Sequence, residues 1–134
     1  IRRDCGVLIT VKDGDKREIV PVAHRLSKLG FELYATGGTA KVLNSEMVPT
    51  NAVRKIGEGK PDIISLLESG KIGYVISTDA KGRIPTLDSV KIRRKAVERS
   101  IPCFTSIDTA SAFVSCLELD ISENDVELVD ITKI

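Results

Sequence analysis

The chain has 134 residues, of which 42% are hydrophobic and 29% are charged, and this balance is typical of one globular domain. Its formal net charge of +1 argues against a general electrostatic attraction to nucleic acid or to a membrane surface, so a site for an anion has to be local. No apolar run approaches the ~18 residues of a membrane-spanning helix. The first residue is Ile1 rather than methionine, and we therefore expect a chain cut from a longer polypeptide.

Strand-like and helix-like segments alternate along the chain, which predicts an α/β fold of one parallel sheet with helices on both faces. The expected strands are Gly6–Val11, Phe31–Ala35, Ala52–Ile56, Tyr74–Ser77 and Pro102–Thr105. The expected helices are Ile19–Leu29, Thr39–Ser45, Ile63–Leu67, Leu87–Arg99 and a last helix capped by Asp108 or Thr109. The alternating tail Val126–Ile131 predicts one short extra strand, and residues 1–134 are read as a single domain.

The three cysteines Cys5, Cys103 and Cys116 are odd in number and lack the spacing of a metal site. We expect them to be buried or half-buried free thiols of a protein from the reducing cytosol.

The segment from Gly30 to Ala40 predicts a place where an anion can bind. A short buried strand runs into Thr36-Gly37-Gly38-Thr39, and a helix follows. Free backbone N–H groups, two hydroxyls and the positive end of a helix dipole then meet at one point, which suits a phosphate. Gly37 and Gly38 would let the backbone approach the anion closely, because neither has a Cβ atom. An ordinary strand-to-helix turn would show the same two glycines, so the loop alone leaves both interpretations open.

Polar side chains also follow the other expected strands, at the edge where an open parallel sheet binds ligands. They are Lys16, Thr36, Thr39, Lys55, Ser77, Thr78, Lys81, Arg83, Thr105 and Ser106. Cations and hydroxyls in this arrangement suit a phosphate that carries a polar group, although each one alone is more often a solvated surface residue.

Residues suited to catalysis are scarce. The single histidine, His24, lies in the middle of an expected helix, and Asp79 is the one carboxylate placed near the sheet edge. One acid without a partner carboxylate or histidine is poor equipment for proton transfer, and no metal-ligand spacing appears. The basic run Lys91–Lys95 would spread its charges around a helix, which favours a solvated or subunit-contacting face over a nucleic-acid site.

Five segments in order resemble a known family: GVLITVKDGDK, GFELYATGGTAKVL, RKIGEGKPDI, IGYVIST and DSVKIRRKAVERSIPCFTS. They resemble the methylglyoxal-synthase-like domain at the carboxyl end of the large chain of carbamoyl-phosphate synthase, over about Gly6–Leu119. This resemblance implies a three-layer sandwich with a five-stranded sheet. It also implies a regulatory module that binds a nucleotide monophosphate, UMP or IMP, and has no catalytic residues of its own.

The resemblance also implies the roles of particular residues. The implied effector-binding residues are Lys16, Thr36, Gly37, Gly38, Thr39, Lys55, Ser77, Thr78, Arg83 and Ser89. Thr105 and Ser106 match a pair that lies near the ornithine site, at the boundary with a neighbouring domain. Ser77 replaces an asparagine of the family and Asp79 replaces a threonine, which puts the identity of the effector in doubt.

For the parent enzyme, the resemblance implies an ATP-dependent, glutamine-hydrolysing ligase of the pyrimidine and arginine pathways in the cytoplasm. Its cofactors would be ATP with magnesium and potassium ions, none of them bound by this domain. The implied partners are the remaining domains of the large chain and a glutaminase small subunit, with no nucleic acid and no membrane. The alternative is a phosphate-binding lyase of the methylglyoxal synthase type. That enzyme needs a histidine at the strand-end edge, which this sequence does not supply.

Overall fold

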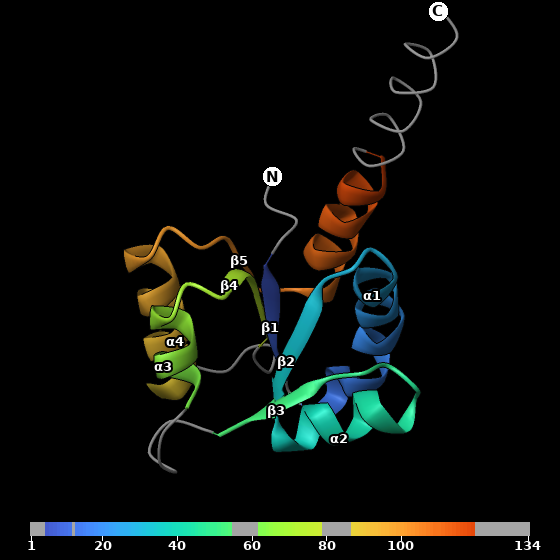
Figure 1. Cartoon of the computed structure of the whole chain (residues 1–134), viewed down its shortest axis with the longest axis horizontal. Helices are drawn as coiled ribbons and strands as arrows, with labels where there is room; N and C mark the ends of the chain where they lie inside the picture. The colour runs from blue at the N-terminus through green and yellow to red at the C-terminus, as the bar shows by residue number, and fades with distance from the viewer. Residues whose placement is uncertain (1–4, 12, 55–61, 79–86, 120–134) are drawn as a thin grey trace, which may run out of the picture.

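The computed structural model describes residues 5–11, 13–54, 62–78 and 87–119, and the statements below refer to them (Figure 1). The order of elements is β1 (Gly6–Thr10), a 3-10 turn η1 (Asp13–Asp15), α1 (Lys16–Lys28), β2 (Glu32–Thr36), α2 (Gly37–Ser45), β3 (Asn51–Val53), α3 (Ile63–Glu68), β4 (Ile72–Ser77), α4 (Leu87–Glu98) and β5 (Cys103–Phe104). A further helix covers residues 107–119. Among these residues no helix is both long and apolar enough to cross a membrane.

The five strands form one sheet in the order β3-β2-β1-β4-β5, and every neighbouring pair is parallel. The predicted parallel α/β architecture is therefore confirmed. Strand β1 lies in the middle, with Leu8 opposite Tyr34 of β2 on one side and Val75 of β4 on the other. Because all strands run the same way, their carboxyl ends meet at one edge of the sheet.

Helices cover both faces of the sheet, which gives three layers (Figure 1). Helices α1, α2 and 107–119 cover one face, and α3 and α4 cover the other. Side chains of β1 alternate between the two cores: Val7 and Ile9 enter the first core, and Leu8 enters the second. The central strands are therefore apolar on both faces, as expected for a buried parallel sheet.

Most predicted helix and strand boundaries agree with the structure to within two residues. The two glycines that were predicted to end helices do so. Gly30 has φ +96° after α1, and Gly70 has φ +81° after α3. These are left-handed conformations that glycine adopts without a Cβ penalty, so both glycines end their helices as predicted. Asp62 caps α3, because its carboxylate accepts a hydrogen bond from the backbone N–H of Ser65 at 2.9 Å.

The start of the last helix was predicted wrongly. The helix begins at residue 107, and its cap is Ser106, whose Oγ accepts a hydrogen bond from the N–H of Thr109 at 3.1 Å. Asp108 and Thr109 therefore lie inside the first turn rather than capping it. Helix α2 likewise begins two residues earlier than predicted, at Gly37 rather than Thr39. The strand predicted at 126–131 lies outside the described residues.

The cysteines differ in exposure more than the sequence predicted. Cys5 is buried and Cys103 is half-buried, but Cys116 is exposed, so the expectation of three buried or half-buried thiols is wrong for Cys116. Burial raises the pKa of the Cys103 thiol, and the positive charge of Arg93 opposes that shift. Thiolate is the reactive form, so a raised pKa slows alkylation at mildly alkaline pH.

We therefore expect iodoacetamide to modify Cys116 first, Cys103 more slowly and Cys5 last. Peptide mass spectrometry over a time course measures the three rates, and a sample in denaturant provides the control with the exposure difference removed. Modification of Cys5 or Cys103 ahead of Cys116 in the folded chain would contradict this ordering.

Candidate functional site

The candidate site lies at the carboxyl edge of the sheet, around β2, β1 and β4. Helices α1 and α2 follow β1 and β2 on one face, and α4 follows β4 on the other (Figure 1). The strand order therefore changes direction between β1 and β4. In open parallel sheets, ligands bind outside the carboxyl ends of the strands at such a point.

The turn from β2 into α2 leaves the start of a helix without a side-chain cap. Thr36 is in the N-cap position, with φ −68° and ψ 159°, but its side chain makes no capping hydrogen bond. The first backbone N–H groups of any α-helix lack partners within the helix, and a helix start carries partial positive charge. Gly37 and Gly38 form the beginning of this nine-residue helix, and both are exposed.

The hydroxyl of Thr39 is buried in the first turn of α2. The residue is 1% exposed, and its Oγ1 has no hydrogen-bond partner among the described residues. Such an atom costs free energy unless something binds it, on the order of 1–3 kcal/mol. An unsatisfied polar atom of this kind in a native fold needs a reason, and an absent ligand supplies one.

Lys16 lies against the same turn from another element. A methyl group added at Gly38 would come within 2.9 Å of Nζ of Lys16 and 3.7 Å of its Cε. Lys16 is the first residue of α1, so the 3-10 turn η1 after β1 directs this ammonium group to the start of α2. A methyl group added at Gly37 would meet no atom of the described residues within 4 Å. As far as these residues define it, the space beside Gly37 is open to a ligand.

Hydroxyl groups line the neighbouring strand ends. Oγ1 of Thr10, the last residue of β1, donates to Oγ of Ser77, the last residue of β4, at 3.2 Å. The backbone N–H of Thr78 donates to the carbonyl of Thr10 at 3.0 Å. Ser77 and Thr78 are buried, at 2% and 7% exposure. The ends of β1 and β4 are thus held together, and β1 is the direct neighbour of β2, which leads into the turn that carries Thr39.

A family comparison identifies what kind of domain presents this arrangement. The sequence profile of the MGS-like domain family matches residues 18–105, which is most of the chain. The chain belongs to the MGS-like domain family. The five-stranded parallel sheet and the position of the glycine turn agree with the resemblance seen in the sequence.

One relative is much longer than this MGS-like domain. The domain is 39% identical over 128 residues to the carbamoyl phosphate synthase large chain of Lachnoclostridium phytofermentans. The match covers 96% of this chain and 12% of that large chain.

Two solved structures share the fold. The methylglyoxal synthase of Elizabethkingia anophelis superposes with a TM-score of 0.67 at 21% identity, covering 86% of this chain and 80% of the other. The protein ForH superposes with a TM-score of 0.62 at 18% identity, covering 87% and 81% of the two chains. At these identities the likeness shows the fold alone.

The structure brings together part of the predicted site. Lys16 and the turn Thr36–Thr39 converge, and Ser77 and Thr78 lie two strands away. Ser106 caps the last helix, and Thr105 is exposed at the end of β5. Ser89 lies in α4, but its side chain is outside the description. Lys55, Asp79, Lys81 and Arg83 also lie outside the described residues.

Two residues at this edge escaped the sequence analysis. Thr10 is one, although its position at the end of a predicted strand could have indicated it. The other is Arg93, whose Nη2 donates to the carbonyl of Ser77 at 3.4 Å. Within the basic run Lys91–Lys95 we predicted a solvated or subunit-contacting face, but Arg93 is half-buried and turns toward the sheet beside the buried Ile92.

The described residues of this edge offer groups that can bind a ligand. Among the described residues no group of three His, Cys, Asp or Glu side chains could hold a metal ion. His24 is exposed in the middle of α1. What the described residues can do is bind an anion and make hydrogen bonds to a polar group attached to it.

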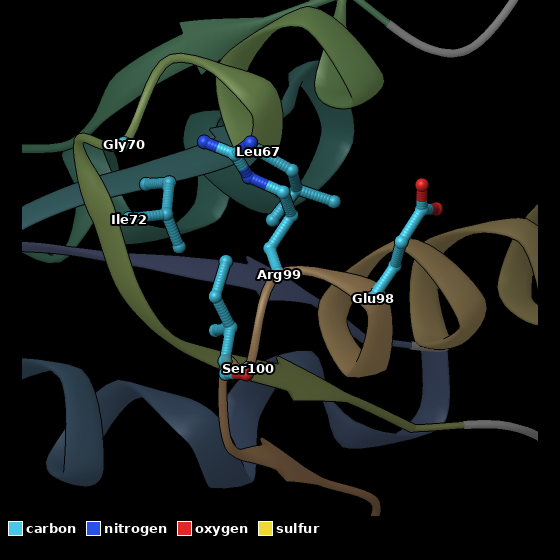
Figure 2. Close-up of a pocket in the computed structure, with 7 residues that line it drawn as sticks. Leu67, Gly70, Ile72, Glu98, Arg99 and Ser100 are labelled. Carbon is cyan, nitrogen blue, oxygen red and sulfur yellow. The ribbon is translucent and has the colours of Figure 1, made fainter.

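A pocket at the opposite, amino edge of the sheet lies away from the candidate anion-binding site (Figure 2). Its lining residues are Leu67, Gly70, Ile72, Glu98, Arg99, Ser100 and Ile101. Ile72 begins β4, so this pocket lies at the amino end of that strand. Nη2 of Arg99 donates to the carbonyl of Glu68 at 3.0 Å, which commits that guanidinium group to closing α3 against α4.

The Gly37→Ala substitution tests whether an anion occupies the space at the start of α2. The new methyl group meets no atom of the described residues, and alanine favours a helix more than glycine, so the melting temperature should stay equal or rise. Inorganic phosphate should nevertheless bind about tenfold more weakly or worse, because the methyl group would occupy the space of the anion and keep it out of hydrogen-bond reach of an N–H group. Losing one hydrogen bond to a charged group costs about 1.5–3 kcal/mol. Calorimetric titration measures the affinity, and the melting temperature of the variant shows that the fold is kept. Equal phosphate affinity in Gly37→Ala and the wild type would place the anion elsewhere.

Proposed function

We propose that this MGS-like domain is the effector-binding regulatory module of a carbamoyl phosphate synthase large chain. The proposed effector is a nucleotide monophosphate, UMP or IMP, whose phosphate group binds at the start of α2. The observation that supports the proposal most strongly is the buried Thr39 hydroxyl, which has no partner within the described residues, in the first turn of an uncapped helix. A bound phosphate oxygen would accept its hydrogen bond.

The groups at this turn suit a phosphate dianion. The first N–H groups of α2 point away from the helix and can donate to the phosphate oxygens, and the helix dipole favours their negative charge. Lys16 adds a full positive charge close to Gly38. Hydrogen bonds that involve a charged group are about twice as strong as neutral ones, so a few of them can hold a small ligand. Lys55 and Arg83 are proposed to add further positive charge.

The neighbouring strand ends suit the rest of a nucleotide. Strands β2, β1 and β4 are adjacent, and neighbouring strands are about 4.8 Å apart. A ligand anchored by its phosphate at β2 would therefore pass the end of β1 and reach β4 within about 10 Å. Thr10, Ser77 and Thr78 border that path with hydroxyl groups that can recognise a ribose or a base. We propose Ser89 as an additional contact.

The parent enzyme is proposed from the longer relative. This chain spans 12% of the length of a carbamoyl phosphate synthase large chain. Carbamoyl phosphate synthesis, its ATP, magnesium and potassium requirements and its service to pyrimidine and arginine pathways would belong to that complete enzyme in the cytoplasm. The proposed partners are the other domains of the large chain, reached through Thr105 and Ser106, and a glutaminase small subunit.

The Thr39→Val substitution tests the phosphate site while nearly keeping the side-chain volume. It removes the one buried hydroxyl that lacks a partner in the described structure, so the folded chain should be at least as stable as the wild type. Affinity for UMP and IMP should fall about tenfold, because a charge-assisted hydrogen bond is lost. Titration calorimetry with both nucleotides measures this change.

Thr50→Val serves as the matched control for this experiment. Thr50 precedes β3 at the opposite edge of the sheet, and its hydroxyl donates to the carbonyl of Val48 at 3.0 Å. Its loss should therefore lower stability slightly and leave nucleotide affinity unchanged. Equal nucleotide affinities in Thr39→Val and the wild type would remove the phosphate from this site.

Dihydroxyacetone phosphate distinguishes the regulatory proposal from lyase chemistry. It is the substrate of methylglyoxal synthase and also carries a phosphate, so weak binding at the same turn is expected. No methylglyoxal should form, because the described part of the edge lacks a histidine and a carboxylate pair for proton transfer. A colorimetric assay for methylglyoxal checks this, and turnover at about 1 s⁻¹ or faster would overturn the proposal.

A further inference from the structure

Arg25 of α1 binds three residues of helix 107–119. Its Nε donates to Oε1 of Glu118 at 3.1 Å, and its Nη2 forms an ion pair with the same oxygen. Its Nη1 donates to Oγ of Ser111 at 3.3 Å, and its Nη2 donates to Oγ of Ser115 at 2.8 Å. The pKa of Arg25 is raised and that of Glu118 is lowered, chiefly by their shared hydrogen bond.

The three bound residues form one stripe of the helix. Ser111, Ser115 and Glu118 are four and three residues apart, so they follow one another along the same face. This stripe lies beside the buried stripe of Ala110, Val114 and Leu117. One planar guanidinium group can contact all three residues only when the helix has one particular rotation and one particular position along its axis.

These contacts orient the helix more than they stabilise it. The side chains of Arg25 and Glu118 are 31% and 42% exposed, and an exposed ion pair contributes little to stability. The buried stripe already holds the helix, with Phe113 stacked on Phe104 at a centroid distance of 4.5 Å. Apolar burial is not directional, so it fixes the rotation and axial position of a helix less sharply than a three-residue hydrogen-bonded contact does.

The same helix α1 also reaches the phosphate site. Lys16 is its first residue and lies against Gly38, whereas Arg25 is nine residues further on, about 13 Å along the helix axis. Pro21, the sixth residue of α1, removes one backbone hydrogen bond between them. Ile19 and Val22 on either side of Pro21 are buried in the same core, and this packing carries a displacement of the first turn to Arg25.

We propose that Arg25 is a positioning residue, which transmits anion capture by Lys16 and the α2 turn to the placement of helix 107–119. This inference rests on the proposed function. A bound phosphate draws Lys16 toward α2 and shifts α1, and the contacts of Arg25 require helix 107–119 to follow. Shifts of about 1–2 Å between packed helices are common in allosteric proteins. An effector acts beyond its own site only through such a second set of contacts that differs between two states.

The Arg25→Met substitution in the complete carbamoyl phosphate synthase tests this coupling. Methionine keeps an unbranched apolar stem and removes all the polar contacts. Affinity for UMP and IMP should stay within about twofold, because Arg25 is not part of the phosphate site. The change in synthesis rate at saturating nucleotide should shrink about fivefold or more, the lower end of a typical allosteric coupling. Amide hydrogen exchange should show a nucleotide-dependent change in helix 107–119 that the variant loses.

Two further variants separate positioning from a general loss of charge or stability. Lys28→Met removes an exposed cation of the same helix and should keep the full response to nucleotide. Arg25→Lys keeps the charge but cannot contact three residues at once, so it should restore only part of the response. Melting temperatures of the three variants show whether helix 107–119 remains in place.

The remaining outcomes of these experiments contradict either the proposed function or the coupling through Arg25. A wild-type enzyme that binds neither UMP nor IMP, or binds them without a change in rate, overturns the proposed function and the coupling with it. A wild-type enzyme that is bound and regulated, together with an Arg25→Met variant that keeps its full response, overturns the coupling alone. A variant that loses nucleotide affinity in proportion to its response also overturns it, because Arg25 would then act on the phosphate site.

Discussion

The parallel pairing of β1 with β2 and β4 is the constraint on which the candidate site depends. Because β1 has a hydrogen-bonded neighbour on each side, the last residues of three strands are fixed side by side. Thr10 and Ser77 are register partners, so their hydroxyls meet without any help from a loop. The sheet is buried on both faces, and this burial makes the pairing of the strands rigid. Sites built on strand ends of this kind keep their geometry better than sites built on loops alone.

The proposed anion site would depend on polar groups at short range rather than on the overall charge of the domain. A net charge of +1 gives no long-range attraction, so binding has to come from contacts at short range. The start of α2 provides partial charges that are part of the backbone, and Lys16 provides a full charge beside them. A site of this kind can select a small phosphate ester while the rest of the surface remains indifferent to polyanions.

The sequence predicted the strand and helix order because hydrophobic periodicity and helix-ending glycines are local signals. Gly30 and Gly70 occupy the left-handed conformations that their positions in the sequence suggested. The cap of the last helix was missed because Ser106, Asp108 and Thr109 are all good capping residues, and only the direction of the chain leaving β5 selects Ser106. Thr10 and Arg93 were missed for a different reason. Their contacts with Ser77 join residues 67 and 16 positions apart, and a sequence pattern does not encode which of several cations turns toward a strand end.

The hydroxyl of Thr39, which has no partner among the described residues, connects stability with the proposed function. A residue that is 1% exposed gains from burying its methyl group, but its hydroxyl lowers that gain unless it is hydrogen-bonded. Alanine or valine would serve a purely structural role better at this position. The start of α2 also lacks a side-chain cap, because the Thr36 side chain is suited to capping but makes no capping hydrogen bond. The two features occur three residues apart, and one phosphate group would satisfy both. The fold can carry this local cost because two apolar cores, one on each face of the sheet, hold the turn in place without the ligand. A phosphate site prepared in this way would lose little of its binding free energy to ordering the α2 turn.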